Sequence, residues 1–134
     1  TAKQAGVSNF GLFNDAGYKG LYGASLSEVE AKKGIKKGEL LDRASSTELA
    51  ANLFRITQTD EKLKKDNVKT EYDARRTHFM VGGKVRQTIK DIGGQLPENI
   101  KPEKHIKEVK KEIKQMEKEA KKALAPKKQP KKLK

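Results

Sequence analysis

The chain has 134 residues, contains no cysteine and no tryptophan, and 37% of its residues are charged. A chain of this length suits one domain with a single hydrophobic core. Without cysteine it has no disulfide, no thiolate metal site and no cysteine nucleophile, and its two histidines, His78 and His105, lie far apart in the sequence. No apolar run reaches the roughly 18 to 20 residues that a membrane span needs. We therefore expect no metal, no cofactor and no membrane segment.

The positive charge is concentrated toward the C-terminal end. The formal net charge is +13, of which residues 101–134 contribute +9. Residues 125–134 contain five lysines, no acid and two prolines, which predicts a disordered tail. Such a tail attracts polyanions, because lysines near phosphates release counterions, although it also fits a merely solubilising end. The tail residues predicted to contact nucleic acid are Lys127, Lys128, Lys131, Lys132 and Lys134.

The segment from Ser8 to Gly23 combines glycines with aromatic residues. Four of the seven aromatic residues of the chain fall here, namely Phe10, Phe13, Tyr18 and Tyr22. Glycine permits positive φ and close backbone approach, so we expect a short helix that runs into a tight loop. Aromatic side chains on a glycine-rich surface can stack on nucleobases, but with so few aromatic residues in the chain we expect these in the core.

Two short helices are expected between residues 25 and 44. Ser25 and Glu28 match a capping box, which predicts a helix over 25–33 that ends at a glycine. A second short segment follows over 37–44. Two such helices around a glycine turn suggest a helix-turn-helix, but the spacing fits imperfectly, and a plain helical hairpin is the preferred interpretation.

Hydrophobic periodicity predicts two longer helices. Ser45 and Glu48 match a second capping box, at the start of a helix that runs to about Lys65. Its apolar stripe, the face that an amphipathic helix buries, contains Leu49, Leu53, Ile56 and Leu63 and is flanked by Ala50 and Phe54. The next helix begins near Thr70, ends at a glycine pair, and carries the stripe Ala74, His78, Val81, Val85, Ile89 and Ile92.

Four basic residues lie away from the apolar stripe on the helix over 70–92. They are Arg75, Arg76, Lys84 and Arg86, and they are candidates for contact with the phosphates of a nucleic acid. A solvated helix surface explains the same four residues equally well. Both interpretations stay open at this point, because no residue that reads a base can be named.

Two further features of the same helix concern packing rather than chemistry. Gly82 and Gly83 in mid-helix each cost about 1 kcal/mol relative to alanine, so we expect another helix to approach closely there. His78 lies on the apolar stripe, and the positions four residues away are Ala74 and Gly82. We therefore expect a hydrogen-bonded core histidine and no catalytic constellation.

A long basic amphipathic helix is predicted from about Glu103 to Leu124. Its apolar residues follow a heptad pattern for nearly three repeats, and nearly all other positions are Lys, Glu or Gln. The pattern suits a coiled-coil seam, or equally a helix that docks on another surface. The residues predicted to mediate self-association or partner contact are Ile106, Val109, Ile113, Met116 and Ala120.

Several blocks of the sequence resemble one bacterial protein family. The run STELAANLFRITQTDEKL over 46–63 is the most distinctive block. Parts of 77–89 and the run over 93–98 continue the resemblance, and 14–23 supplies a glycine–tyrosine segment. Together these blocks are similar to the C-terminal half of the DNA-damage-inducible protein D family.

The resemblance implies a regulatory rather than an enzymatic role. Family members are induced in the SOS response and are proposed to act in recombinational repair, on RecA-type recombinase filaments on single-stranded DNA. They usually begin with a BRO-type N-terminal domain, shared with phage antirepressors, to which nothing in this sequence corresponds. The chain begins at Thr1 rather than Met, so we expect a fragment, a processed form or an excerpt of a longer protein.

These elements predict an all-α protein of about five helices. We expect a compact helical core domain over 1–97, an amphipathic basic helix over 98–124 and a disordered tail over 125–134. The expected function is a non-enzymatic, cytoplasmic module of the bacterial SOS response, with nucleoid association open. It would bind DNA or a RecA-type filament and modulate recombinational repair.

The alternative is an assembly protein, related to phage antirepressor-type proteins, that uses the stripe over 106–123 for self-association or partner docking. A nuclease is disfavoured, because acids such as Asp60, Glu71 and Asp73 are dispersed among lysines rather than clustered. The oligomeric state and the preference for single-stranded DNA, duplex DNA or RNA stay open.

Overall fold

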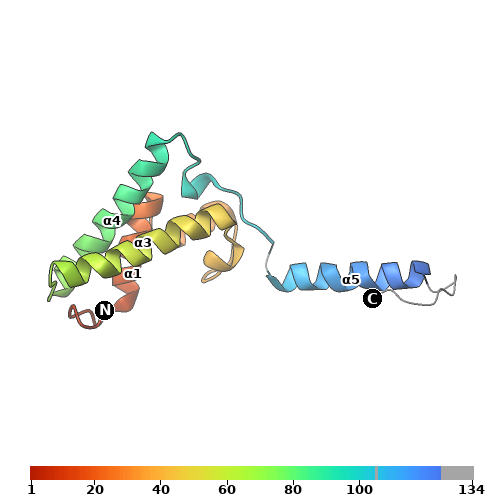
Figure 1. The fold of residues 1–134 in the computed structure, drawn as a ribbon, viewed down its shortest axis with the longest axis horizontal. Helices are drawn as coiled ribbons and strands as arrows, with labels where there is room; N and C mark the ends of the chain where they lie inside the picture. Colours follow the sequence, from red (N-terminus) through yellow and green to blue (C-terminus); the bar gives the residue numbers. More distant parts are fainter. Residues whose placement is uncertain (105, 125–134) are drawn as a thin grey trace. The chain divides into compact units, whose positions relative to one another are not determined.

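The computed structural model describes residues 1–104 and 106–124, and over these residues every regular element is a helix (Figure 1). The elements are α1 (Phe10–Tyr22), α2 (Leu26–Lys33), the 3-10 turn η1 (Leu41–Arg43), α3 (Ser46–Lys65), α4 (Glu71–Asp91), the 3-10 turn η2 (Pro97–Asn99) and α5 (Ile106–Leu124). The all-α prediction is confirmed. The tail predicted to be disordered, 125–134, lies outside the described residues.

The chain forms two compact units that separate after Glu103. The sequence predicts the end of the core domain after residue 97, whereas residues 98–103 belong with the first unit. Two contacts account for this. Glu98 forms an ion pair with Arg86, and the backbone N–H of Glu103 donates to the carbonyl oxygen of Arg43 at 2.6 Å.

Side-chain caps begin three of the helices where the sequence places them. Ser25 Oγ accepts a hydrogen bond from the N–H of Glu28, and the Glu28 carboxylate accepts one from the N–H of Ser25, so the first capping box is confirmed. Thr70 caps α4. Ser45 caps α3, but the buried carboxylate of Glu48 bonds elsewhere and does not complete the second predicted box.

The segment between α2 and α3 differs from the prediction. Over 37–44 the chain forms only the 3-10 turn η1. Gly34 and Gly38 adopt φ of 70° and 84°, in the left-handed region that ends a right-handed helix. Between residues 25 and 44 the structure is therefore one helix followed by a turn, and neither the helix-turn-helix nor the helical hairpin forms.

Helices α1 and α4 cross at glycines. An added Cβ on Gly20 would lie 2.2 Å from the carbonyl oxygen of Phe79, and one on Gly82 would lie 2.7 Å from the carbonyl oxygen of Gly17. No side chain tolerates such distances, so only glycine lets the two backbones approach this closely. The close approach predicted at Gly82 is confirmed, whereas a Cβ on Gly83 would meet nothing within 4 Å.

Two apolar clusters fill the first unit. One contains Leu21, Tyr22, Val29, Ile35, Leu40 and Val85, and the other contains Ala5, Val7, Phe13, Leu63 and Ala74. The stripe predicted on α4 is buried from Ala74 to Val85, although Ile92 at its end is 77% exposed. Of the early aromatic residues, Phe13 and Tyr22 lie in the core as predicted, while Phe10 is 46% exposed.

Helix α3 buries a different face from the predicted one. Leu49, Leu53 and Ile56 are 43%, 62% and 45% exposed, and only Leu63 of the predicted stripe is buried. The buried face carries polar side chains instead, each no more than 2% exposed: Glu48, Asn52, Arg55 and Thr59. The apolar stripe is the wrong guide here, because neighbouring helices offer hydrogen-bond partners to Glu48, Asn52 and Arg55. The buried hydroxyl of Thr59 has no such partner among the described residues.

The glycine crossing predicts opposite outcomes for two neighbouring substitutions. Gly82→Ala places a methyl group against the backbone of α1 and should lower the free energy of unfolding by about 1–3 kcal/mol. Gly83→Ala meets open space and should raise it by about 0.5–1 kcal/mol through helix propensity. Chemical denaturation followed by circular dichroism measures both, and equal effects would contradict the crossing.

Candidate interaction surfaces around a buried polar network

Glu48 joins three helices from a fully buried position. Its Oε1 accepts a hydrogen bond from Lys33 Nζ on α2 at 2.8 Å, and its Oε2 accepts one from Tyr22 Oη on α1 at 2.5 Å. Lys33 Nζ also donates to the carbonyl oxygen of Ile100 at 2.8 Å. The side chains of Lys33 and Glu48 are 3% and 0% exposed, so they form a buried and well-satisfied ion pair.

Arg55 extends these contacts from α3 to α4. Its Nη2 donates to Asn52 Oδ1 at 2.9 Å, and its Nη1 donates to His78 Nε2 at 2.6 Å. The guanidinium also lies 4.7 Å from the centre of the Tyr18 ring, a cation–π distance. Asn52 Nδ2 donates in turn to Tyr22 Oη at 2.8 Å, which makes all these contacts one network. We call it the buried polar network; its members are Tyr22, Lys33, Glu48, Asn52, Arg55 and His78.

Burial controls the protonation of the network. Burial, followed by the hydrogen bond to Glu48, raises the pKa of the Tyr22 hydroxyl, which therefore stays protonated and donates. The Nδ1 of His78 bonds to the carbonyl oxygen of Phe13 at 2.8 Å. A carbonyl only accepts, so Nδ1 carries the hydrogen and Nε2 accepts from Arg55. Burial, and then the charge of Arg55, lower the pKa of His78 to about 4, against the opposing effect of the Phe13 bond.

His78 is thus the hydrogen-bonded core histidine that the sequence predicts. The network members on α3 are Glu48, Asn52 and Arg55. The sequence analysis does not predict them as buried residues, although they follow one another at helical spacings of four and three residues. That regular polar spacing was the available signal. Because these side chains are buried, the network orients the helices, and the surfaces that can meet a partner lie outside it.

The four basic residues predicted on α4 lie in different settings. Arg86 is held within the fold, since its Nη1 and Nη2 donate to the two carboxylate oxygens of Glu98 at 2.6 and 2.8 Å. This bond raises the pKa of Arg86. Arg75 and Arg76 line a groove beside α1, and Lys84 lines a groove beside α3. Three of the four residues stay candidates for contact with an anion: Arg75, Arg76 and Lys84. Arg86 is instead ion-paired with Glu98.

The α1–α4 groove has a volume of about 410 Å³ and combines cations with aromatic rings. It is lined by Leu12, Asp15, Ala16, Lys19, Tyr72, Arg75, Arg76 and Phe79. Tyr72 and Phe79 are 65% and 52% exposed, and the Arg76 guanidinium lies 5.9 Å from the centre of the Tyr72 ring. Neither aromatic residue was predicted as a surface feature.

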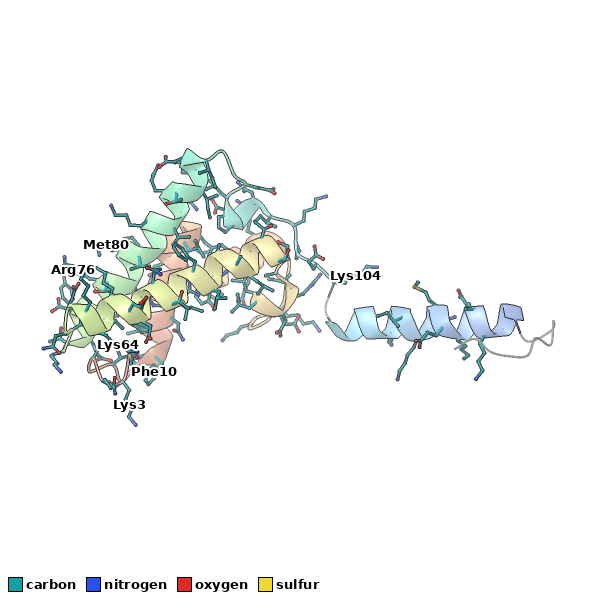
Figure 2. The ribbon with its side chains drawn as sticks, viewed as in Figure 1. Lys3, Phe10, Lys64, Arg76, Met80 and Lys104 are labelled. Atoms are coloured by element: carbon teal, nitrogen blue, oxygen red, sulfur yellow. The ribbon has the colours of Figure 1, made fainter. Side chains whose placement is uncertain are left out.

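The α3–α4 groove is larger, with a volume of about 710 Å³. Its lining residues are Phe54, Gln58, Glu61, Lys62, Lys65, Met80, Val81, Lys84, Val85 and Thr88. Figure 2 labels Met80 of this groove and Arg76 of the other groove, both on α4. The two grooves use different faces of this helix, because one takes Met80, Val81, Lys84, Val85 and Thr88 from it and the other takes Tyr72, Arg75, Arg76 and Phe79.

The predicted contact residues of α5 are only partly described. The side chains of Ile106 and Val109, and the tail lysines from Lys127 onward, lie outside the described set. Ile113 and Met116 are 49% and 65% exposed, and Ala120 is also exposed. The described part of the predicted stripe therefore consists of exposed, mainly apolar side chains of α5.

Nowhere in 1–104 and 106–124 do three or more histidine, aspartate or glutamate side chains gather as metal ligands would. Within the same residues, no helix is both long and apolar enough to cross a membrane.

The fold and its surfaces define a small all-helical module with a buried polar network and surface grooves. The profile of the DinD C-terminal domain family matches residues 1–111, and the chain belongs to this family. The chain is 48% identical over 118 residues to DNA damage-inducible protein D of Escherichia coli (strain K12). The resemblance read from the sequence is confirmed. This match covers 84% of the chain and 43% of that protein, so the chain spans less than half of its relative. No solved structure matches the chain.

The free energy of unfolding should fall as the pH is lowered from the pKa that His78 has in the unfolded chain toward its lower pKa in the folded chain. The pKa is about 4 in the folded chain and 6.5 for an unperturbed histidine, so the unfolded chain takes up the proton first. The free energy of unfolding should drop by about 2 kcal/mol between pH 7 and pH 5. Urea unfolding at several pH values measures the drop. His78→Gln should flatten the profile, and an unchanged profile would assign the effect elsewhere.

The buried ion pair predicts a compensating double substitution. Glu48→Gln leaves the ammonium of Lys33 buried without its counter-charge and should cost about 3–5 kcal/mol of stability. Adding Lys33→Met removes the stranded charge and should restore much of that loss. A double-mutant cycle by chemical denaturation measures the coupling, and simple additivity of the two losses would contradict it.

Proposed function

We propose that this chain is a non-enzymatic binding module of the DNA-damage response that contacts single-stranded nucleic acid, free or within a RecA-type recombinase filament. Membership of the DinD C-terminal domain family, and the name of the relative from E. coli, support the link to DNA damage. The composition of the α1–α4 groove supports the contact with nucleic acid. That groove is the observation on which the proposal rests.

Surfaces that bind single-stranded nucleic acid combine exposed aromatic rings with positively charged side chains. Unpaired bases stack on aromatic side chains, and each such contact contributes about 1–3 kcal/mol whatever the base. Tyr72 and Phe79 offer two rings that are more than half exposed. Isolated apolar residues on a surface are common, but two aromatic residues beside two arginines in one groove match a stacking surface.

The charges around these rings favour a polyanion. Lys19, Arg75 and Arg76 line the groove with a single acid, Asp15. Asp15 Oδ2 lies 3.7 Å from Lys19 Nζ in an exposed ion pair. Such a pair contributes little stability, so Lys19 can still contact a phosphate. The lysine-rich sequence over 125–134 would add attraction that is not specific to sequence.

Removing the two arginines should weaken binding and reduce its dependence on salt. For the variant Arg75→Ala with Arg76→Ala, the log–log salt slope on a single strand should fall by about 1.4, since each phosphate contact contributes about 0.7. Fluorescence anisotropy of a labelled oligonucleotide at several salt concentrations measures the slope. Lys64→Ala removes an exposed lysine of α3 outside the groove and is the matched control. Equal slopes in all three proteins would remove this surface from the proposal.

Two further variants separate stacking and the tail from the arginines. Phe79→Ala should weaken binding by about 1–3 kcal/mol with an unchanged salt slope, because the lost contact is uncharged. A chain that ends at Leu124 should keep the stacking contribution and lose part of the slope. Full affinity after both changes would exclude Phe79 and the tail from the contact, whereas no binding by the unmodified chain at low salt would indicate that the module acts through protein contacts.

A further inference from the structure

The α3–α4 groove has an apolar floor and a basic rim. Phe54 and Met80 are 54% and 43% exposed, and Val81 and Val85 lie buried beneath them. Three lysines and one glutamate line its edges: Lys62, Lys65, Lys84 and Glu61. Along α3 the groove runs from Phe54 to Lys65, a length of about 16 Å. Its shape and chemistry suit a helix with an apolar seam and acidic borders.

Helix α5 of this chain is such a helix. Ile113, Met116 and Ala120 follow one another at spacings of three and four and are exposed, and the seam that they form is about 10 Å long. Glu117 and Glu119 border this seam on its two sides. The described lysines of α5 occupy the remaining faces of the helix; they are Lys111, Lys114, Lys118, Lys121 and Lys122.

We propose that α5 of a second copy of this chain docks in the α3–α4 groove. Ile113 and Met116 would cover Phe54 and Met80, and the glutamates that border the seam would face the lysines of the rim. Because α5 belongs to a unit separate from the groove, two copies can exchange their helices reciprocally. The exchange closes a symmetric dimer in which both seams and both grooves are filled.

The same charges give less support to a coiled coil between two α5 helices. In such a pair the residues that border one seam lie against those that border the other. The described borders, Glu117 and Glu119, are both acidic and offer each other no opposite charge. The lysine rim of the groove is the better complement for these two glutamates, so we assign α5 to the groove.

Analytical ultracentrifugation from about 1 to about 100 micromolar tests the exchange. The unmodified chain should form a dimer, and Met80→Asp in the groove or Met116→Asp in the seam should each raise the dissociation constant at least about tenfold. Leu12→Asp, at an apolar residue of α1 that is 49% exposed, should leave it unchanged. Because all three positions are exposed, we expect each variant to fold, which circular dichroism and chemical denaturation measure.

Mixing the two defective variants provides the decisive outcome. Met116→Asp keeps an intact groove and Met80→Asp keeps an intact seam, so their mixture should associate where each alone does not. A Met80→Asp protein that dimerises as tightly as the unmodified chain would indicate an α5 coiled coil and overturn the proposal. So would a chain that stays monomeric throughout, as expected if α5 folds onto its own copy.

Charge reversal provides a second test. Changing the three rim lysines, Lys62, Lys65 and Lys84, to glutamate should weaken the dimer, and Glu117→Lys with Glu119→Lys should restore it. No restoration would overturn the pairing. The inference is independent of the nucleic-acid contact, because Arg75 and Arg76 do not line this groove. Their alanine variant should lose DNA affinity and keep the dimer.

Discussion

The orientation of α3 about its own axis depends on two buried charged groups. Both lie inside the first unit: the Glu48 carboxylate finds its partners on α1 and α2, and the Arg55 guanidinium finds its partners on α3 and α4. Rotating α3 to bury its leucines would strand both groups at a cost of several kcal/mol each. Leaving Leu49 and Leu53 about half exposed sacrifices only part of the roughly 1.5–3 kcal/mol that burying each would contribute. The polar face therefore stays inside.

The glycine crossing and the polar network depend on each other. An added Cβ on Gly17 would lie 2.2 Å from His78 Nε2, the atom that accepts the hydrogen bond from Arg55. Glycine at this position makes room for the imidazole, and the close approach of α1 and α4 brings the Phe13 carbonyl within 2.8 Å of Nδ1. A side chain at the crossing would thus disturb both the helix contact and the network.

The inward polar face also produces the outward apolar one. Since α3 turns Glu48 and Arg55 inward, Phe54 faces outward beside Met80 of α4 and helps to line the α3–α4 groove. On the other side of α4, Tyr72 and Phe79 line the α1–α4 groove with two arginines. Stability and recognition therefore rest on different residues of the same helices, which is why surface substitutions can separate the proposed functions.

The sequence by itself determined the helical class, most helix starts and the family. Local features decide these properties: Ser25 and Thr70 cap their own helices, and the apolar spacing of α4 marks its buried face. The family could be read from the run over 46–63, which also contains Glu48, Asn52 and Arg55 of the network.

Only the tertiary structure decided which face of α3 is buried. A polar side chain is stable inside a protein when partners meet it, and the partners of Glu48 and Arg55 include Tyr22, Lys33 and His78, from 15 to 26 residues away. The regular polar spacing along α3 marks a possible face of the helix, but it does not identify the distant groups that meet that face. The grooves were hidden for the same reason, since each combines side chains from two helices that meet only in the folded chain.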